Sequence, residues 1–361
     1  MNDANELISF IASMSGEGNL RVEENLGEWY VRLRVSEAER RQAKHDIQHV
    51  EDIVIEMLRN ARDAGADKVY LATTKEDGVR TLVFLDNGSG VPQDMQERIF
   101  DARVTSKLES MKMDRWGVHG RGMALFSIKQ NTDEARVVTS DVDLGSVFKV
   151  SVATDRLGER ADQSSWPQAV KDEDGHYVCA RGPHNIIRAA CEFALEELRA
   201  CDVYLGSPSE IAATLHAQAS SRLDASRLLF IDDEAELPVV DRLGLASDAE
   251  DFIRICSGLG LEMSERTAHR ILAGQIKPVR GVTARLLRER DSSSHASAPV
   301  DLAKDRRGLR IAKDDMAQFS RAVERDFNDL ASRYYLNLCG DPKIRVSRDR
   351  ITVTFDLAKE E

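Results

Sequence analysis

The chain has 361 residues, of which 42% are apolar and 31% charged, and its formal net charge at pH 7 is −12. This length and apolar content suffice for two domains with cores of their own. The acidic balance disfavours binding to nucleic acid unless basic residues cluster, and no apolar run is long enough to span a membrane. The N-terminus lacks a basic-then-apolar signal, and the five scattered cysteines form no C-x-x-C pair. We therefore expect a cytoplasmic protein with free thiols.

The first segment with candidate catalytic side chains is a helix predicted over residues 49–64. Ile53, Met57 and Ala61 give it an apolar stripe at helical spacing. Glu56 and Asn60 are four residues apart and so share one face. A carboxylate can deprotonate water and an amide oxygen can bind Mg²⁺, although a solvated polar pair would have the same spacing.

A hairpin is predicted next, with strands over 68–72 and 80–85 joined by a turn that contains Gly78. The second strand ends at Asp86, and Gly88 and Gly90 follow. These glycines let the backbone approach a flat ligand closely, and a carboxylate beside them can accept a hydrogen bond from an adenine amino group. The alternative is an ordinary turn after a strand.

A glycine run with the order G-x-x-G-x-G covers residues 117–122, and an apolar stretch over 123–128 is predicted to start a helix. Free N–H groups at a helix start suit phosphate oxygens. The order differs from the dinucleotide fingerprint, and the absence of any Gly-Lys pair excludes a Walker A loop. Lys107 offers a cation for the same phosphates. A surface loop is the simpler alternative.

Together these blocks resemble the GHKL ATPase superfamily, which comprises DNA gyrase B subunits, heat-shock-protein-90 chaperones, sensor histidine kinases and MutL. The resemblance covers about residues 40–155. It implies an α/β sandwich with a mixed sheet and an ATP site with Mg²⁺. By this resemblance Glu56 and Lys107 are the catalytic residues and Asn60 is the metal ligand. The remaining nucleotide-binding positions are Asp63, Asp86, Gly88, Gly90, Thr105, Gly117, Val118, His119, Gly120, Arg121, Gly122 and Met123, together with Asn60.

Three residues bear on the branch of the superfamily. Thr105 and Lys107 match a T-S-K element of the MutL and topoisomerase branch, whereas Met123 stands where MutL-type lids carry a glutamate. A histidine kinase is disfavoured because His45 lies too close to Glu56 for a separate dimerising helical domain between them.

The rest of the chain is predicted to be mixed. A strand over 182–188 is expected to close the ATPase sheet, and further elements follow it. These are helices over 189–199, 209–220, 248–260, 264–273, 278–290 and 314–335, and strands over 202–205, 228–231, 343–347 and 351–355. Between Glu265 and Arg290, seven Lys or Arg stand against two Glu. This basic helical stretch is similar to the helix-two-turn-helix insert of type IIB topoisomerase B subunits, or it is a solvated bundle.

The expected domain organisation has five parts. These are an N-terminal strap over 1–40, the ATP-binding domain over 41–205 with a loop at 156–180, a helical basic region over 206–290, a linker over 291–300, and a C-terminal α/β part over 301–361. Lys277 is the residue to test as the lysine that a transducer domain sends to the γ-phosphate, although its loop matches the family poorly.

The expected function is therefore Mg²⁺-dependent ATP hydrolysis by an ATPase subunit similar to the topoisomerase VI B subunit. Such a protein would form an ATP-driven homodimer and would act on DNA with a separate DNA-cleaving subunit. The alternatives are a chaperone-like or signalling switch with a protein partner, and a MutL-like mismatch-repair ATPase.

Overall fold

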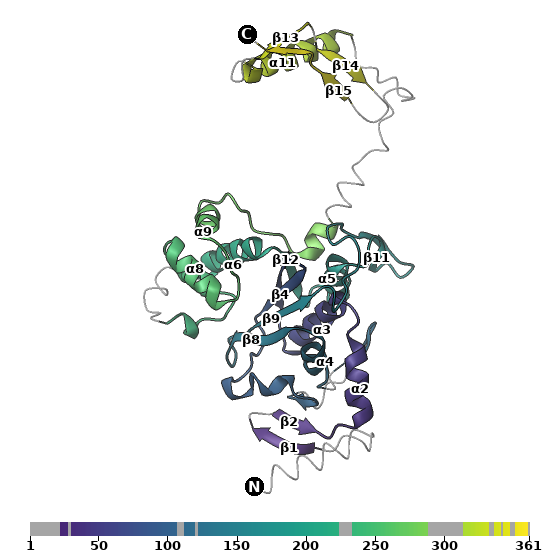
Figure 1. Cartoon of the computed structure of the whole chain (residues 1–361), viewed down its shortest axis with the longest axis vertical. Coiled ribbons are helices and arrows are strands. Elements are labelled where there is room, and N and C mark those ends of the chain that lie inside the picture. Colours follow the sequence, from purple (N-terminus) through teal and green to yellow (C-terminus); the bar gives the residue numbers. More distant parts are fainter. Residues whose placement is uncertain are drawn as a thin grey trace. The chain divides into compact units, whose positions relative to one another are not determined.

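The computed structural model describes residues 22–27, 30–106, 112–119, 122–223, 233–287, 313–331, 336–340, 342–346 and 351–359. The chain divides into two compact units, 1–288 and 289–361, and each is described by itself (Figure 1). Among the described residues, none of the helices combines the length and the apolar content that a bilayer-crossing segment requires.

The first unit is built on a five-stranded sheet with the order β12-β3-β4-β9-β8. Its strands are β3 (Lys68–Glu76), β4 (Val79–Asp86), β8 (Glu134–Ser140), β9 (Ser146–Ala153) and β12 (Asp202–Gly206). Strand β12 runs parallel to β3, and the other neighbours are antiparallel. The mixed α/β class is therefore confirmed.

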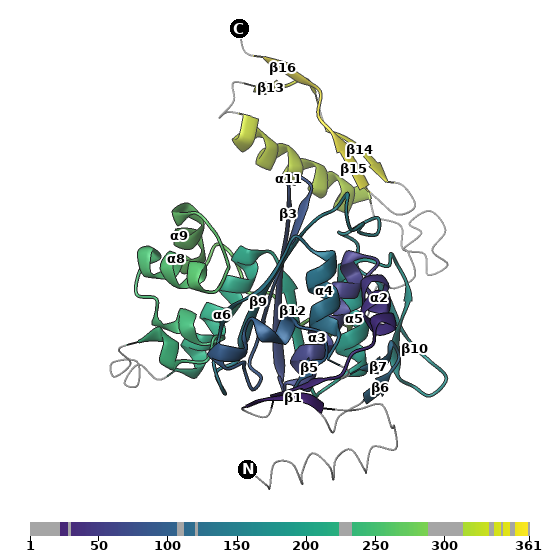
Figure 2. The same cartoon turned by 60° about the horizontal axis from the view of Figure 1, so that its bottom comes forward.

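Successive residues of a strand point to opposite faces of the sheet, and both faces are buried here. On one face Leu71 and Phe84 pack in a core with Leu58 and Phe193 of α3 (Val50–Asp63) and α5 (Ile186–Glu196). α4 (Ala124–Asn131) covers the same face (Figure 2). On the other face Tyr70, Ala72, Val83 and Leu85 pack in a second core, with residues of α6 (Pro208–Arg222), α8 (Ala249–Gly258) and α9 (Glu265–Leu272). The sheet thus lies between two helical layers.

Smaller elements surround this core. β1 (Val22–Gly27), β2 (Tyr30–Leu33) and β5 (Val104–Thr105) form a three-stranded sheet. α2 (Glu37–Asp46) follows β2, and β6 (Lys112–Asp114) pairs with β7 (Gly117–His119). The unit also contains the hairpin of β10 (Gln168–Lys171) and β11 (Tyr177–Arg181), a short helix over 282–287, and the 3-10 helices η1 (Gln93–Met95), η2 (Arg98–Phe100), η3 (Glu234–Glu236) and η4 (Arg242–Leu245).

Three sequence predictions need correction here. The expected strand over 182–188 is wrong, because Asn185 caps α5 by accepting a hydrogen bond from the Arg188 backbone N–H at 2.8 Å. The fifth strand of the sheet is β12. The loop at 156–180 contains β10 and the start of β11. The helix expected from residue 278 starts at 282, and in the segment before it the N–H of Val279 donates to Thr214 Oγ1. The strand expected over 228–231 lies outside the described residues.

The second unit contains α11 (Lys313–Ala331) and two strand pairs. β13 (Leu336–Leu338) pairs with β16 (Leu357–Lys359), and β14 (Lys343–Val346) pairs with β15 (Ile351–Thr354). The rings of Phe327 and Phe355 stack with centroids 4.1 Å apart, which packs the helix against the chain end. The sequence predicted α11, β14 and β15 and missed the other two strands.

Candidate active site

One cavity of about 490 Å³ lies in the first unit, beside the sheet face that α3 covers. It is bordered by α3, the end of β4, β5 and the start of α4. Its lining includes eight of the residues that the sequence singled out, namely Glu56, Asn60, Asp63, Asp86, Gly90, Thr105, Gly122 and Met123. The structure therefore brings together side chains that are spread over almost seventy positions of the chain.

Helix α3 supplies the polar wall of this cavity. Its first turn is closed by a capping box of His49 and Asp52, and its apolar side is buried in the core. Glu56 and Asn60 both line the cavity, as the i, i+4 spacing predicts. The Glu56 carboxylate is held in place, because its Oε1 accepts a hydrogen bond from Arg59 Nη1 at 2.7 Å.

Asp86 lies at the end of β4 and is 4% exposed. Its Oδ1 accepts the backbone N–H of Gly88 at 2.8 Å, which orients the carboxylate. A Cβ on Gly88 would lie 2.8 Å from the carbonyl oxygen of Ala64, so a side chain at this position is excluded. Gly90 adopts φ +71°, and a Cβ there would lie 1.7 Å from the carbonyl oxygen of Asp141. Both glycines are required by close backbone approach.

The T-S-K element begins in β5 of the three-stranded sheet, next to the cavity. Thr105 is buried in β5, where it pairs with Val31 of β2, and it lines the cavity together with Ser106. The third member of the element, Lys107, lies outside the described residues.

The glycine run is partly strand and partly helix start. Gly117, Val118 and His119 form β7, which the sequence did not predict. Gly122 has φ +67° and packs against Arg103 and Val104, and Met123 is the N-cap of α4. The N-terminus of α4 thus opens into the cavity through Gly122, Met123 and Ala124. Gly120 and Arg121 lie outside the described residues.

Sequence reasoning missed several residues of the site. Ser146 lies opposite Asp86 in the β4–β9 pair and lines the cavity; only the pairing register of two distant strands could have revealed it. Arg59, which lines the cavity beside Glu56 and is 3% exposed, was also missed, and so was Asp114, its ion-pair partner behind the cavity wall. Asp63 does line the cavity, but its Oδ1 is 2.9 Å from Nε of Arg62.

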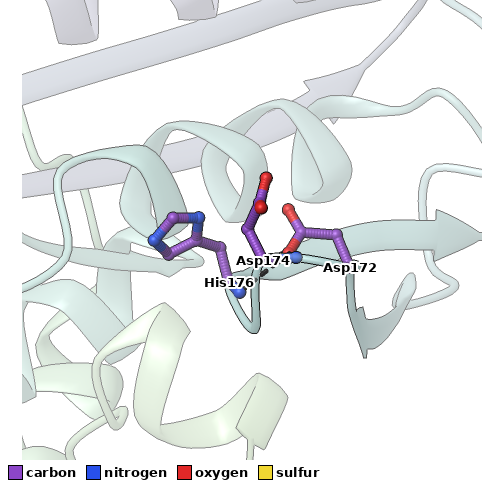
Figure 3. A group of neighbouring side chains, drawn as sticks. All are labelled: Asp172, Asp174 and His176. Carbon is purple, nitrogen blue, oxygen red and sulfur yellow. Dashed lines mark hydrogen bonds between the residues drawn. The ribbon is translucent and has the colours of Figure 1, made fainter.

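A second group of polar side chains lies away from this cavity. Asp172, Asp174 and His176 stand together at the turn between β10 and β11 (Figure 3), and all three are exposed. Asp172 Oδ1 accepts the backbone N–H groups of Asp174 at 3.1 Å and of His176 at 2.8 Å. These bonds form the tight turn, so we assign the group to turn formation.

Comparison with known proteins agrees with this geometry. Residues 47–162 match the family described as histidine kinase-, DNA gyrase B-, and HSP90-like ATPase. A DNA mismatch repair protein MutL from Thermodesulfovibrio yellowstonii is 34% identical over 98 residues, which are 26% of this chain and 18% of that protein. A DNA mismatch repair protein MutL from Staphylococcus aureus strain Newman is 28% identical over 136 residues, 35% of this chain and 20% of that protein. The chain thus matches about a fifth of the length of these relatives. The segment over 47–162 is thus similar to the ATPase domains of the GHKL superfamily, and MutL proteins are among its relatives.

Proposed function

We propose that the first unit binds ATP with Mg²⁺ in this cavity and hydrolyses it. The observation that carries the proposal is the convergence of Glu56, Asn60, Asp86 and the N-terminus of α4 on a single cavity. Its volume of about 490 Å³ lies in the range of small-molecule sites.

Each wall has a distinct part in binding. Asp86 would accept a hydrogen bond from the adenine amino group, since an ionised carboxylate acts only as an acceptor. The N–H groups at the start of α4, after Gly122, would donate to phosphate oxygens, and the helix dipole favours the negative charge there. Lys107 and the glycine run would complete the phosphate contacts.

Asn60 would hold Mg²⁺, which supplies charge neutralisation between the phosphates when it is bound. The donor set fits such an ion, because the amide oxygen of Asn60 and the carboxylates of Glu56 and Asp63 line the same wall and hard cations prefer oxygen ligands.

Glu56 would accept a proton from the attacking water, whose oxygen bonds to the terminal phosphorus as the bond from that phosphorus to the ADP oxygen breaks, so that ADP and phosphate are released. In phosphoryl transfer most of the rate comes from positioning and charge stabilisation. The buried surroundings of α3, with Glu56 held by Arg59, suit that requirement.

The test compares the wild type with Glu56→Gln, which keeps the shape of the side chain and removes the base. We expect ATP affinity to change little and turnover to fall by a factor of about 10² or more. Glu76→Gln, at the exposed end of β3, is the matched control and should behave as the wild type does. If the wild type neither binds nor hydrolyses ATP, the proposal is wrong.

We further propose that DNA is the partner of this ATPase. The MutL relatives are named as DNA mismatch repair proteins, and a basic surface supports the same partner. Arg266 and Arg270 of α9 and the following Lys277 and Arg280 are exposed, in a chain of net charge −12. None of the four forms an ion pair with a described residue. Unpaired cations of this kind suit phosphates.

Two other basic residues of this stretch are less suited to the test. The guanidinium of Arg285 lies 3.9 Å from the ring centroid of Trp166, and Arg288 lies outside the described residues. Lys277 is exposed and lies on the opposite side of the sheet from the α3 layer, among residues packed with α6 and α9. A role at DNA phosphates therefore fits Lys277 better than a transducer role.

Binding to duplex DNA should be measured at several salt concentrations for the wild type and for a variant with Arg266, Arg270, Lys277 and Arg280 changed to Glu. We expect wild-type affinity to fall steeply with salt and the variant to lose both affinity and salt dependence, by about one unit of slope for each phosphate contact. Arg136→Glu, on β8, is the control. A variant that binds as tightly as the wild type would remove DNA as a partner of this surface and favour a protein partner.

Within a DNA-processing role, a topoisomerase VI B-like subunit and a MutL-like protein are the two candidates. Met123 at the start of α4 is the residue that disfavours MutL itself. Homodimerisation on ATP binding is part of both, and light scattering with and without a non-hydrolysable ATP analogue tests it. A chain that turns over ATP and stays monomeric would instead favour a nucleotide switch.

A further inference from the structure

Two arginines of α3 contact one carboxylate of the β6–β7 hairpin, next to the proposed base. Arg59 Nε donates to Asp114 Oδ2 at 2.9 Å, and Arg62 Nη1 donates to the same oxygen at 3.1 Å. On its other edge, Arg59 Nη1 donates to Glu56 Oε1 at 2.7 Å. The side chains of Arg59 and Asp114 are only 3% and 6% exposed. One buried guanidinium therefore connects Glu56 to Asp114 of the hairpin, which lies 55 residues beyond Arg59 along the chain.

The contacts of Arg59 with Glu56 and with Asp114 have different consequences. A buried guanidinium needs anionic partners, and truncating one of them is strongly destabilising. Asp114 shares the charge of Arg59 with Glu56 and fixes the plane of the guanidinium, because the Nε and Nη1 bonds point in different directions. Without the Asp114 charge, Arg59 would be less well oriented and would attract the Glu56 carboxylate more strongly.

Asp114 is itself fixed by the hairpin. Its Oδ1 accepts the backbone N–H of Trp116 at 3.1 Å, and Asp114 pairs with Gly117 across the two strands. The Trp116 ring lines the cavity and stacks on Phe193 of α5, with centroids 6.4 Å apart. The place of the Asp114 carboxylate thus depends on the hairpin being folded against α3 and α5.

We propose that Arg59 is a positioning residue for Glu56 and that Asp114 sets the orientation of Arg59. In consequence, the hydrolytic step depends on the Asp114 carboxylate of the β6–β7 hairpin through the orientation of Glu56. The inference rests on the proposed ATP hydrolysis. It adds that Asp114 of the β6–β7 hairpin controls the position of the catalytic base Glu56.

The experiment uses the full chain and measures kcat, KM and the Kd of a non-hydrolysable ATP analogue. Asp114→Asn keeps the shape of the side chain and an acceptor for Trp116 while it removes the charge. We expect kcat to fall at least about tenfold with the analogue Kd within about twofold of the wild type. Glu197→Gln is the matched control: Glu197 Oε1 lies 3.1 Å from Arg62 Nη1, and its described contacts do not include Arg59. Its kcat should stay within about twofold of the wild type.

A double variant separates positioning from general damage. If Asp114 acts through Arg59, then Arg59→Gln combined with Asp114→Asn should be no slower than Arg59→Gln alone, because effects within one chain of contacts are not additive. Arg59→Lys keeps the charge and loses the two-sided contact, so its kcat should lie between those of the wild type and Arg59→Gln. If Asp114→Asn has a lowered Tm, Arg59→Lys is used as the test variant in its place.

The outcomes distinguish this inference from the function on which it rests. A folded Asp114→Asn protein with wild-type kcat would overturn the inference and leave the ATPase intact. An equal loss of kcat in Asp114→Asn and Glu197→Gln would overturn it as well, since Arg62 and not Arg59 would then be responsible. A wild type that shows no turnover would overturn both.

Discussion

Asp86 and Ser146 face each other across the antiparallel pair of β4 and β9, and both line the cavity. The Ser146 hydroxyl also accepts a hydrogen bond from Ser140 Oγ at 3.1 Å, and Ser140 Oγ accepts the backbone N–H of Val91 at 2.8 Å. The end of β4 is therefore joined to the loop after it through two serines.

The first prediction concerns recognition of the nucleobase of ATP by Asp86. Asp86→Asn should weaken ATP binding by about 10- to 100-fold, because a hydrogen bond to a charged group contributes roughly 1.5–3 kcal/mol. Ser146→Ala should weaken it less, since a neutral hydroxyl contributes about 1 kcal/mol. Calorimetric titration with ATP and GTP measures both effects. If Asp86→Asn and the wild type bound ATP with equal affinity, adenine would not bind at Asp86.

The second prediction compares two glycines with positive φ. A Cβ on Gly90 would lie 1.7 Å from the Asp141 carbonyl oxygen, whereas Gly78, at φ +79°, has no atom within 4 Å of that position. Gly78→Ala should therefore lower the free energy of unfolding only by the backbone term of about 1–2 kcal/mol. Gly90→Ala should lower it further and weaken ATP binding. Urea denaturation measures the difference, and matching midpoints for the two variants would contradict it.

A third prediction concerns acid stability. Burial raises the pKa of Glu159, but hydrogen bonds from Lys75 and Arg80 outweigh it and hold the pKa below the ordinary 4.5. Because the folded pKa is depressed, this contribution is present above the unfolded value and is lost as the pH falls through the folded value. Glu159→Gln should then lower the free energy of unfolding by about 1–3 kcal/mol at pH 7 and by less at about pH 3.5. If the free energies of unfolding of Glu159→Gln and the wild type differed by the same amount at both pH values, this explanation would be wrong.

The cysteines supply the fourth prediction. Burial raises the pKa of the Cys201 and Cys256 thiols to about 12 in both cases, while Cys339 is exposed. Since the thiolate is the reactive form, Cys339 should react with a maleimide at pH 8 well before the two buried thiols. Mass spectrometry of partly labelled protein gives the order, and denaturant should abolish it. Early labelling of Cys256 in folded protein would mean that the core around α8 opens readily.

Much of the first unit could be predicted because its signals are local. The stripe that predicts α3 and the turn residues that predict the β3–β4 hairpin act within one or two turns of chain. The error at 182–188 arose from the β-branched pair Ile186 and Ile187, which favours a strand. Asn185 as an N-cap, with apolar residues following at helical spacing, was the stronger signal for α5.

The remaining features depend on contacts between distant residues. No local pattern indicates that β12 pairs with β3, or that Ser146 lies opposite Asp86, since both follow from the register of the sheet. The contact of Arg59 with Asp114 joins residues 55 positions apart. The second helical layer, over Tyr70 and Leu85, was also unexpected, because the alternation in β3 and β4 does not reveal what covers each face.

The place of Trp116 has an optical consequence. Of the three tryptophans in the chain, Trp116 lines the cavity and Trp166 stacks on Arg285. An indole ring emits at a wavelength that depends on the polarity around it, and it can be quenched by a neighbouring base. The intrinsic fluorescence of Trp116 should therefore change when a nucleotide enters, which makes the wild-type chain its own unlabelled sensor. A Trp116→Phe protein would keep the aromatic packing on Phe193 and lose that signal.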